Sequence, residues 1–170
     1  NTYQTNPNST DSDEDGLSDI EEIYRGLNPN SPDSDTDGLS DSDELNTHGT
    51  NPLSVDTDGD GVNDNDELNT HMTDPVNNDS DTDRLLDGEE LAAGTNPNNP
   101  DSDEDGLSDY DELNVWATDP NSPDTDEDGL TDSDEVQTHE TDPNSTDSNG
   151  DGLTDGDEVS TYGTNPLESD

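Results

Sequence analysis

The chain has 170 residues, of which 50 are acidic and two are basic, so its formal net charge at pH 7 is -48. Nucleic acid and anionic membrane surfaces require Lys and Arg, so both are excluded as partners, and no run of about 18 apolar residues is present to span a membrane. Only 18% of the residues are hydrophobic, which is too little to offset a backbone ordering cost of about 1–2 kcal/mol per residue. Either the chain is disordered, or something other than apolar burial orders it.

A twelve-residue unit recurs along the sequence. It begins at Asp11, Asp33, Asp56, Asp79, Asp101, Asp124 and Asp147. Successive units are 22 or 23 residues apart, and the first and fourth repeats are the short ones. The template is D-x-D-x-D-G-Φ-x-D-x-[DE]-E, in which Φ is aliphatic. Because the charge is assigned to fixed positions, we expect an ordered protein once the right counter-ion is present. Positions are numbered below from the first Asp of each repeat.

Both ends of the sequence fit the same period. Residues 2–10 correspond to the end of a preceding repeat, and Asp170 lies where an eighth unit would begin. We therefore interpret residues 1–170 as a single tandem array of seven repeats with partial repeats at both ends, taken from a longer protein with neighbouring domains.

Alternate Asp residues at positions 1, 3 and 5 turn three carboxylates toward one point when the backbone curls around it, and Gly at position 6 supplies the turn. The carbonyl of position 7 then points inward, and Glu at position 12 adds two oxygens, as in an EF-hand calcium loop. Oxygen ligands without nitrogen or sulfur suit Ca²⁺, whereas Mg²⁺ prefers a tighter octahedron with several waters. We predict at least one calcium ion per repeat. The predicted ligands are Asp11, Asp13, Asp15, Leu17 and Glu22; Asp33, Asp35, Asp37, Leu39 and Glu44; Asp56, Asp58, Asp60, Val62 and Glu67; Asp79, Asp81, Asp83, Leu85 and Glu90; Asp101, Asp103, Asp105, Leu107 and Glu112; Asp124, Asp126, Asp128, Leu130 and Glu135; Asp147, Asn149, Asp151, Leu153 and Glu158, with the aliphatic residues acting through their carbonyls.

Two copies depart from the template. The fourth has Arg84 in place of Gly, where a left-handed backbone would cost about 1–2 kcal/mol and where the guanidinium would oppose a cation. The seventh has Asn149 at position 3, a neutral oxygen ligand that removes charge and keeps the geometry. We expect the fourth site to be the weakest.

Three further positions have two interpretations each. The Asp at position 9 binds calcium through water, or it caps a helix, since D-x-x-E resembles a capping box. The acid at position 11 serves a second ion, or it lies on a solvated helix face. The Asn or Asp before each Pro completes a second site between repeats, or it is a turn residue held extended by the proline.

About eleven residues separate successive units, and each spacer contains a proline, so only one short helix fits, starting near position 8 or 9. Aliphatic residues at positions 7 and 13, such as Val62 with Leu68, are expected to form small contacts worth about 3–6 kcal/mol per repeat. This is too little without metal, so we expect folding to be coupled to ion binding. The predicted fold has little regular secondary structure: an elongated, calcium-stabilised array of EF-hand-like loops, each with one short helix.

The unit, its aliphatic position 7 and its 22–23-residue step resemble thrombospondin type 3 repeats. The cysteine-free bacterial version carries spacers such as GTNP at Gly49–Pro52 and TDP at Thr73–Pro75. The resemblance implies two ions per repeat, the second held in the third repeat by Asp58, Asp60 and Glu67. It also implies a bacterial, secreted or cell-surface location, because bacterial members link domains in adhesin-like and outer-membrane surface proteins.

We therefore expect a monomeric calcium-binding spacer or stalk, made rigid by Ca²⁺, in an extracellular or cell-surface protein. The alternatives are a calcium-dependent adhesion or protein-binding module and an extracellular calcium buffer. We do not expect an enzyme, because the carboxylates are assigned to metal and no nucleophile–base set recurs.

Overall fold

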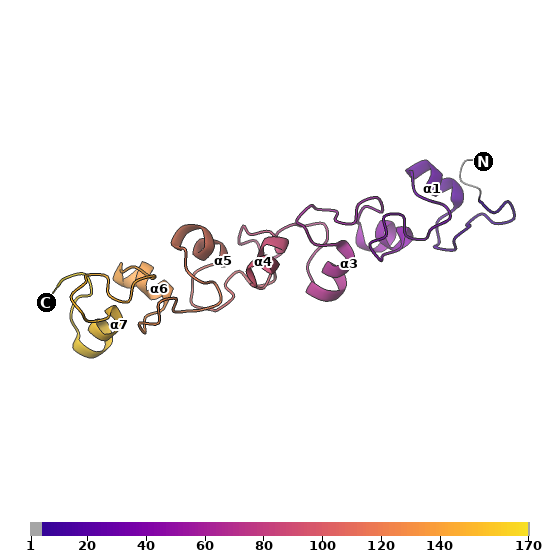
Figure 1. Ribbon diagram of the computed structural model, residues 1–170. Helices are drawn as coiled ribbons and strands as arrows, with labels where there is room; N and C mark the ends of the chain where they lie inside the picture. The colour runs from indigo at the N-terminus through magenta and orange to yellow at the C-terminus, as the bar shows by residue number, and fades with distance from the viewer. Residues whose placement is uncertain (1–4, 170) are drawn as a thin grey trace. The chain divides into compact units, whose positions relative to one another are not determined.

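A computed structural model describes residues 5–169, and within that range the regular structure consists of one short helix per repeat without any strand (Figure 1). This confirms the predicted fold class of loops that each carry one short helix. None of the helices in the described part of the protein is long and apolar enough to cross a membrane. The helices, with π-helical turns marked η, are α1 (Asp19–Arg25), α2 (Asp41–Asp43) with η1 (Glu44–His48), α3 (Asp64–Asp66) with η2 (Glu67–His71), α4 (Asp87–Ala93), α5 (Asp109–Asp111) with η3 (Glu112–Trp116), α6 (Asp132–Asp134) with η4 (Glu135–His139), and α7 (Asp155–Asp157) with η5 (Glu158–Tyr162).

Each helix starts at position 9, and in six of the seven repeats a polar residue at position 8 caps it. In α2 the Ser40 hydroxyl accepts a hydrogen bond from the Asp43 N–H at 3.1 Å, which satisfies one of the free N–H groups of the first turn. The fourth repeat has Leu86 at position 8, which cannot cap. There the Glu89 carboxylate accepts from the Leu86 N–H at 3.3 Å. This is one of the two hydrogen bonds of a capping box; the other needs a polar side chain at position 8.

The difference between 22- and 23-residue repeats lies inside the helix. In the first repeat the N–H of Gly26 donates to the Glu22 carbonyl, four residues earlier, and closes an α-helical turn. In the second repeat the N–H of Gly49 donates to the Glu44 carbonyl, five residues earlier, and closes a π-helical turn. One inserted residue is the usual origin of a π-turn. The insertion is thus absorbed by the helix, and the loop before it keeps the same length.

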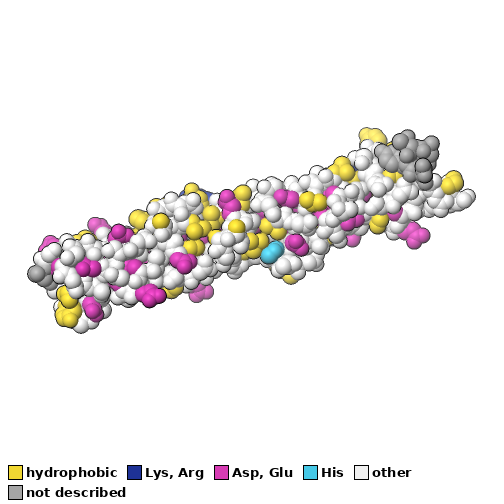
Figure 2. Space-filling model, viewed as in Figure 1, with side chains coloured by type: hydrophobic (Ala, Val, Ile, Leu, Met, Phe, Trp, Pro, Cys, Tyr) yellow, Lys and Arg dark blue, Asp and Glu magenta, His cyan; other side chains and the backbone are white. Residues whose placement is uncertain are grey.

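More carboxylates than aliphatic groups are buried among the described residues. Figure 2 shows one face on which acidic side chains are scattered among backbone and uncharged groups. The aliphatic residue at position 7 is buried in most repeats, as at Leu17 and Val62. The residue at position 13 is partly buried in five repeats and exposed in two, at Ile23 (42% exposed) and Leu113 (40% exposed). Position 13 is less buried than position 12 because it lies about 100° further around the helix, and its predicted contact with position 7 stays a prediction.

The protein divides into two compact units of tandem repeats. Among the described residues, the first unit takes those up to Ser80 together with Leu86–Glu89, and the second takes Asp81–Leu85 together with those from Glu90 onward. All three changes from one unit to the other fall in the fourth repeat, which carries Arg84.

Candidate metal centres

Backbone N–H groups hold each loop closed around its own carboxylates, as the third repeat illustrates. The two oxygens of Asp56 accept from the N–H groups of Gly59 at 2.7 Å and Gly61 at 3.1 Å. One oxygen of Asp58 accepts from Asp60 at 3.3 Å, and one oxygen of Asp60 accepts from Val62 at 2.7 Å. These short-range bonds are typical of Asp in turns. They use one oxygen of positions 3 and 5 and leave the second oxygen of each for another partner.

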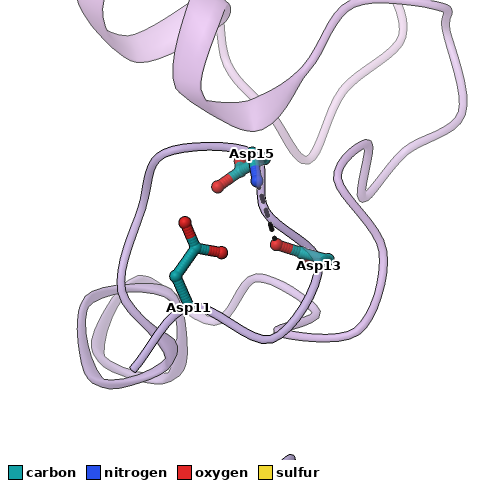
Figure 3. Close-up of side chains that lie close together, drawn as sticks. All are labelled: Asp11, Asp13 and Asp15. Atoms are coloured by element: carbon teal, nitrogen blue, oxygen red, sulfur yellow. Dashed lines mark hydrogen bonds between the residues drawn. The ribbon is translucent and has the colours of Figure 1, made fainter. Parts of the chain in front are cut away.

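The acids at positions 1, 3 and 5 lie together, as the spacing predicts. In the first loop one oxygen of each of Asp11, Asp13 and Asp15 lies within 4.8 Å of the other two, and Figure 3 shows these carboxylates turned toward the interior of the loop. The same cluster forms in the second and third loops. Its members there are Asp33, Asp35 and Asp37, and Asp56, Asp58 and Asp60. That these clusters bind calcium remains a prediction.

A second cluster joins each of two repeats to the next one. Oxygens of Asp60 and Glu67, from positions 5 and 12 of the third repeat, lie within 4.8 Å of Asp87, from position 9 of the fourth. Asp37, Glu44 and Asp64 form the equivalent group one repeat earlier, and all six of these residues are buried. An ion held there would contact two consecutive repeats. The set differs from the Asp58, Asp60 and Glu67 that the family resemblance implies, because it recruits an acid from the following repeat.

The strongest sign of a cation is a series of buried carboxylate oxygens without a hydrogen-bond partner. The Glu at position 12 has no exposed surface in any of the seven repeats. The oxygens without a partner include Oδ2 of Asp13, Asp35, Asp58, Asp103 and Asp126, Oε2 of Glu44, Glu67, Glu112 and Glu135, and both carboxylate oxygens of Glu22. Burying a charge without a partner is costly, so such groups require an explanation. An all-oxygen, anionic donor set fits Ca²⁺, which would supply the missing positive charge.

The pKa values show the same unsatisfied charge. Burial, followed by repulsion from Asp58, raises the pKa of Glu67 to about 8. Burial likewise raises the pKa of Glu22, Glu44, Glu112 and Glu135 to about 8. At position 3, burial raises the pKa of Asp58, Asp103 and Asp126 to about 6. Without metal, the glutamates therefore hold protons near neutral pH, and a cation that binds must displace them.

In the 23-residue repeats a threonine that follows the helix orients the position-12 glutamate. This role was not predicted from the sequence. Thr73 is 7% exposed, and its hydroxyl donates to Glu67 Oε1 at 3.1 Å, which leaves Oε2 for another partner. The same bond, at 3.0–3.2 Å, links Thr50, Thr118, Thr141 and Thr164 to their own glutamates. The signal in the sequence is a Thr directly before the Asn/Asp-Pro pair in every repeat but the first, where Leu27 replaces it.

The position-9 aspartate has a role that neither sequence interpretation included. Asp64 accepts from both the N–H and the hydroxyl of Thr57, at position 2 of its own repeat, each at 2.7 Å. The same pair of bonds joins Asp41 to Ser34. The capping interpretation is wrong, because position 8 caps the helix. Position 9 instead ties the start of the loop to the start of the helix and, in the second cluster, faces the preceding repeat.

The other two open positions show the features of the simpler interpretation. The acid at position 11 is exposed in every repeat except the fifth, where it is partly buried, so it lies on a solvated helix face. The acid or amide before each proline forms a turn. In the third repeat one Asp74 oxygen accepts from the Val76 N–H at 3.3 Å, two residues ahead. Neither position belongs to the clusters described above.

Arg84 makes the fourth loop different in backbone and in side chain. Its φ of 98° is left-handed, as at the glycines that occupy position 6 elsewhere. Its guanidinium lies 5.5 Å from the ring centroid of Tyr110, at position 10 of the next repeat. The N–H of Tyr110 also donates to Oδ2 of Asp83 at 2.8 Å. The arginine thus adds a cation–π contact between consecutive repeats, at the expense of a strained loop.

We expect Arg84→Gly to stabilise the fourth repeat and to tighten its calcium binding. Relief of the left-handed strain is worth about 1–2 kcal/mol, and the lost exposed cation–π contact about 0.5–1 kcal/mol, so the net gain is small and favourable. Calcium titration and urea unfolding at saturating calcium measure it. Gly61→Arg is the reciprocal control: φ is 101° and a Cβ there meets nothing within 4 Å, so the strain and the added positive charge should appear without the cation–π contact. An unchanged or weakened Arg84→Gly protein would contradict this prediction.

The seventh repeat satisfies its glutamate without a cation. Asn149 Nδ2 donates to Glu158 Oε2 at 3.2 Å, and Thr164 donates to Glu158 Oε1 at 3.0 Å. Both oxygens of Glu158 therefore have partners, unlike those of Glu67 or Glu112. The amide at position 3 thus supplies the partial positive charge that the other repeats lack.

Comparison with known proteins gives one family and partial likenesses to solved structures, of which two are described here. The profile described as "Bacterial TSP3 repeat" matches seven consecutive segments, residues 11–32, 33–55, 56–78, 79–100, 101–123, 124–146 and 147–169. A structure titled "Biofilm associated protein - B domain" is 47% identical over 28% of this chain and 11% of its own length, with a TM-score of 0.27. Another, titled "Biofilm associated protein - BSP domain", is 50% identical over 26% of this chain and 8% of its own length, with a TM-score of 0.26. The comparison with curated proteins finds no match.

Proposed function

The chain belongs to the family of bacterial TSP3 repeats, and from that premise we propose that it is a calcium-binding structural spacer of a bacterial secreted or cell-surface protein. The observation that carries this proposal is the recurring pair of buried oxygens without partners, at positions 3 and 12. A protein without metal would have to bury these charges unpaired, or take up a proton at each, in repeat after repeat. With a divalent cation in each loop, the same groups become ligands and the loop becomes ordered.

We further propose two ions per repeat. The first is held by the acids at positions 1, 3 and 5, with the carbonyl of position 7. The second is held by positions 5 and 12 together with position 9 of the next repeat, as the group of Asp60, Glu67 and Asp87 suggests. Because the second ion contacts two repeats, it limits their relative movement and stiffens the spacer. The net charge of -48 exceeds what fourteen divalent ions would neutralise, so the loaded protein stays acidic.

An extracellular location suits such sites. Calcium is present at millimolar concentration outside cells, which fills even weak sites of the kind found in extracellular modules. A spacer that folds only where calcium is abundant would become rigid after export. The role requires binding and stiffness and no catalytic step, so we propose no enzymatic activity.

A calcium titration of metal-free protein tests the proposal. We expect helical circular dichroism to appear and the radius of gyration from small-angle X-ray scattering to fall at millimolar calcium, with reversal by EDTA. Magnesium at equal concentration is the control and should act much more weakly, because it dehydrates reluctantly. Native mass spectrometry counts the ions and separates one per repeat from two. A protein that neither orders nor compacts with calcium would refute the proposal.

A further inference from the structure

The seventh loop contains the one Asn-Gly pair of the sequence, Asn149–Gly150, at positions 3 and 4. The other six loops have Asp at position 3, and most have Glu or Thr at position 4. A following glycine has no Cβ, so its backbone nitrogen can closely approach the side chain that precedes it. Asn-Gly is for this reason the pair most prone to cyclise. Asn149 lies at position 3, a predicted ligand position, and its conversion to aspartate would give the acid that the template has there.

In the folded loop the Asn149 amide is held on both sides. Its Nδ2 donates to Glu158 Oε2 at 3.2 Å and to the Glu168 carbonyl at 3.4 Å, and its Oδ1 accepts from the Asp151 N–H at 2.9 Å. The side chain is partly buried. Rotation of the amide toward its own backbone would break these contacts.

The Gly150 backbone nitrogen, which must attack Asn149 Cγ for the pair to cyclise, is held as well. The Gly150 N–H donates to Asp147 Oδ1 at 2.7 Å, and the backbone of Gly150 is fixed at a φ of 74°. Cyclisation requires this nitrogen to lose its proton and reach Asn149 Cγ. With both groups hydrogen-bonded elsewhere, the reaction must wait until the loop opens, so its rate follows the population of the open loop.

We propose that Asn149–Gly150 is a self-modification site, at which loss of ammonia turns the neutral position 3 into a carboxylate at a rate set by the calcium loading of the seventh repeat. The Gly150 nitrogen forms a bond to Asn149 Cγ, the Cγ–Nδ2 bond breaks, and the Gly150 proton leaves with ammonia. Water then opens the cyclic imide. Cleavage of the new N–Cγ bond gives aspartate at this position, and cleavage of the original peptide bond gives isoaspartate. This inference rests on the proposed function, because it requires calcium to close the loop.

The two products change the site in opposite ways. The aspartate product completes the acids of the seventh loop and removes the N–H donor from Glu158, so that Oε2 of Glu158 is left as it is in Glu67 or Glu112. The repeat, which already needs calcium to offset Asp147 and Asp151, then depends on calcium more strongly. Isoaspartate places an extra carbon in the backbone between positions 3 and 4, which disturbs the spacing of positions 1, 3 and 5 and weakens the site.

Incubation of the full-length protein with EDTA or with saturating calcium, at the same mildly alkaline pH, tests the proposal. Peptide mapping by mass spectrometry follows conversion at Asn149. We expect the conversion of Asn149 to be at least about tenfold slower with calcium, because the reaction occurs only from the open loop, which calcium makes rarer. The matched control is Gly150→Thr: Thr36 occupies position 4 of the second repeat at a φ of 69°, so the loop accepts it. This variant should resist conversion in both buffers.

Asn149→Asp, the expected product, supplies a second readout. It should bind calcium more tightly than the unmodified protein, and it should retain less helical circular dichroism in EDTA. If calcium orders the protein and Asn149 still converts equally fast in both buffers, the inference is overturned and the proposed function stands. If calcium does not order the protein, the proposed function fails, and with it the reason for protection.

Discussion

Glu67→Gln is expected to lower the calcium affinity of the third repeat and to stabilise the metal-free protein. In calcium we expect the apparent affinity of the third repeat to fall by at least about tenfold, which corresponds to about 1.4 kcal/mol. In metal-free buffer we expect residual helical structure to increase. A reversal of sign between the two buffers is specific to a buried metal ligand. A glutamate with a merely structural role would change stability in the same direction in both.

The environment of Glu67 explains the two signs. The side chain has no exposed surface, Thr73 donates to Oε1, and Oε2 has no partner. Without metal, folding must either bury the ionised carboxylate beside Asp60 and Asp87 or protonate it near neutral pH, and both cost free energy that glutamine does not. Glutamine has the same shape, carries no charge and offers N–H donors to the neighbouring carboxylates. In calcium the same change removes one anionic ligand oxygen and the charge that attracts the ion.

Asp66→Asn is the matched control. It lies next to Glu67, removes the same unit of charge, and is exposed at position 11. Surface changes of this kind usually alter stability by no more than about 0.5 kcal/mol. Calcium titration by calorimetry and circular dichroism in chelated buffer measure both variants. Equal effects of Asp66→Asn and Glu67→Gln would show that net charge, and not the buried site, governs calcium binding.

Acidification is expected to restore structure to the metal-free protein. The pKa of Glu67 is raised from its ordinary value of 4.5 to about 8 by burial, and Glu22, Glu44, Glu112 and Glu135 behave alike. A group whose pKa is higher in the folded state contributes stability that is fully present below the unfolded value and is lost as the pH rises through the folded value. Helical content should therefore increase as the pH falls from about 8 toward about 4.5.

Protons and calcium compete for the same oxygens, so the loaded protein should respond in the opposite direction. At limiting calcium, acidification should release ions, because a ligand carboxylate must be deprotonated to bind. Circular dichroism of protein freed of metal by dialysis, at constant ionic strength, measures the first effect, and a calcium-sensitive electrode measures the second. Loss of helical signal on mild acidification of the metal-free protein would contradict the prediction.

The sequence alone determined the local features, because they depend on spacing within one repeat. Acids at positions 1, 3 and 5 must converge once Gly61 and its counterparts turn the backbone, and the loop of Asp11, Asp13 and Asp15 shows that they do. The start of the helix, its single occurrence per repeat and the family followed from the same short-range pattern. The left-handed backbone at Arg84 was also expected, since it replaces a glycine.

The tertiary structure decided what depends on contacts between turns and between repeats. Spacing could not show that the extra residue of the long repeats forms a π-turn, since loop and helix can both absorb an insertion. Nor could it place Asp87 against Asp60 and Glu67, because that contact requires one repeat to pack on the next. The burial of position 12, the lesser burial of position 13 and the bond from Asn149 to Glu158 follow from which way the helix faces. A repeat pattern thus specifies each loop, whereas the helix orientation and the packing of successive repeats decide which carboxylates share a site.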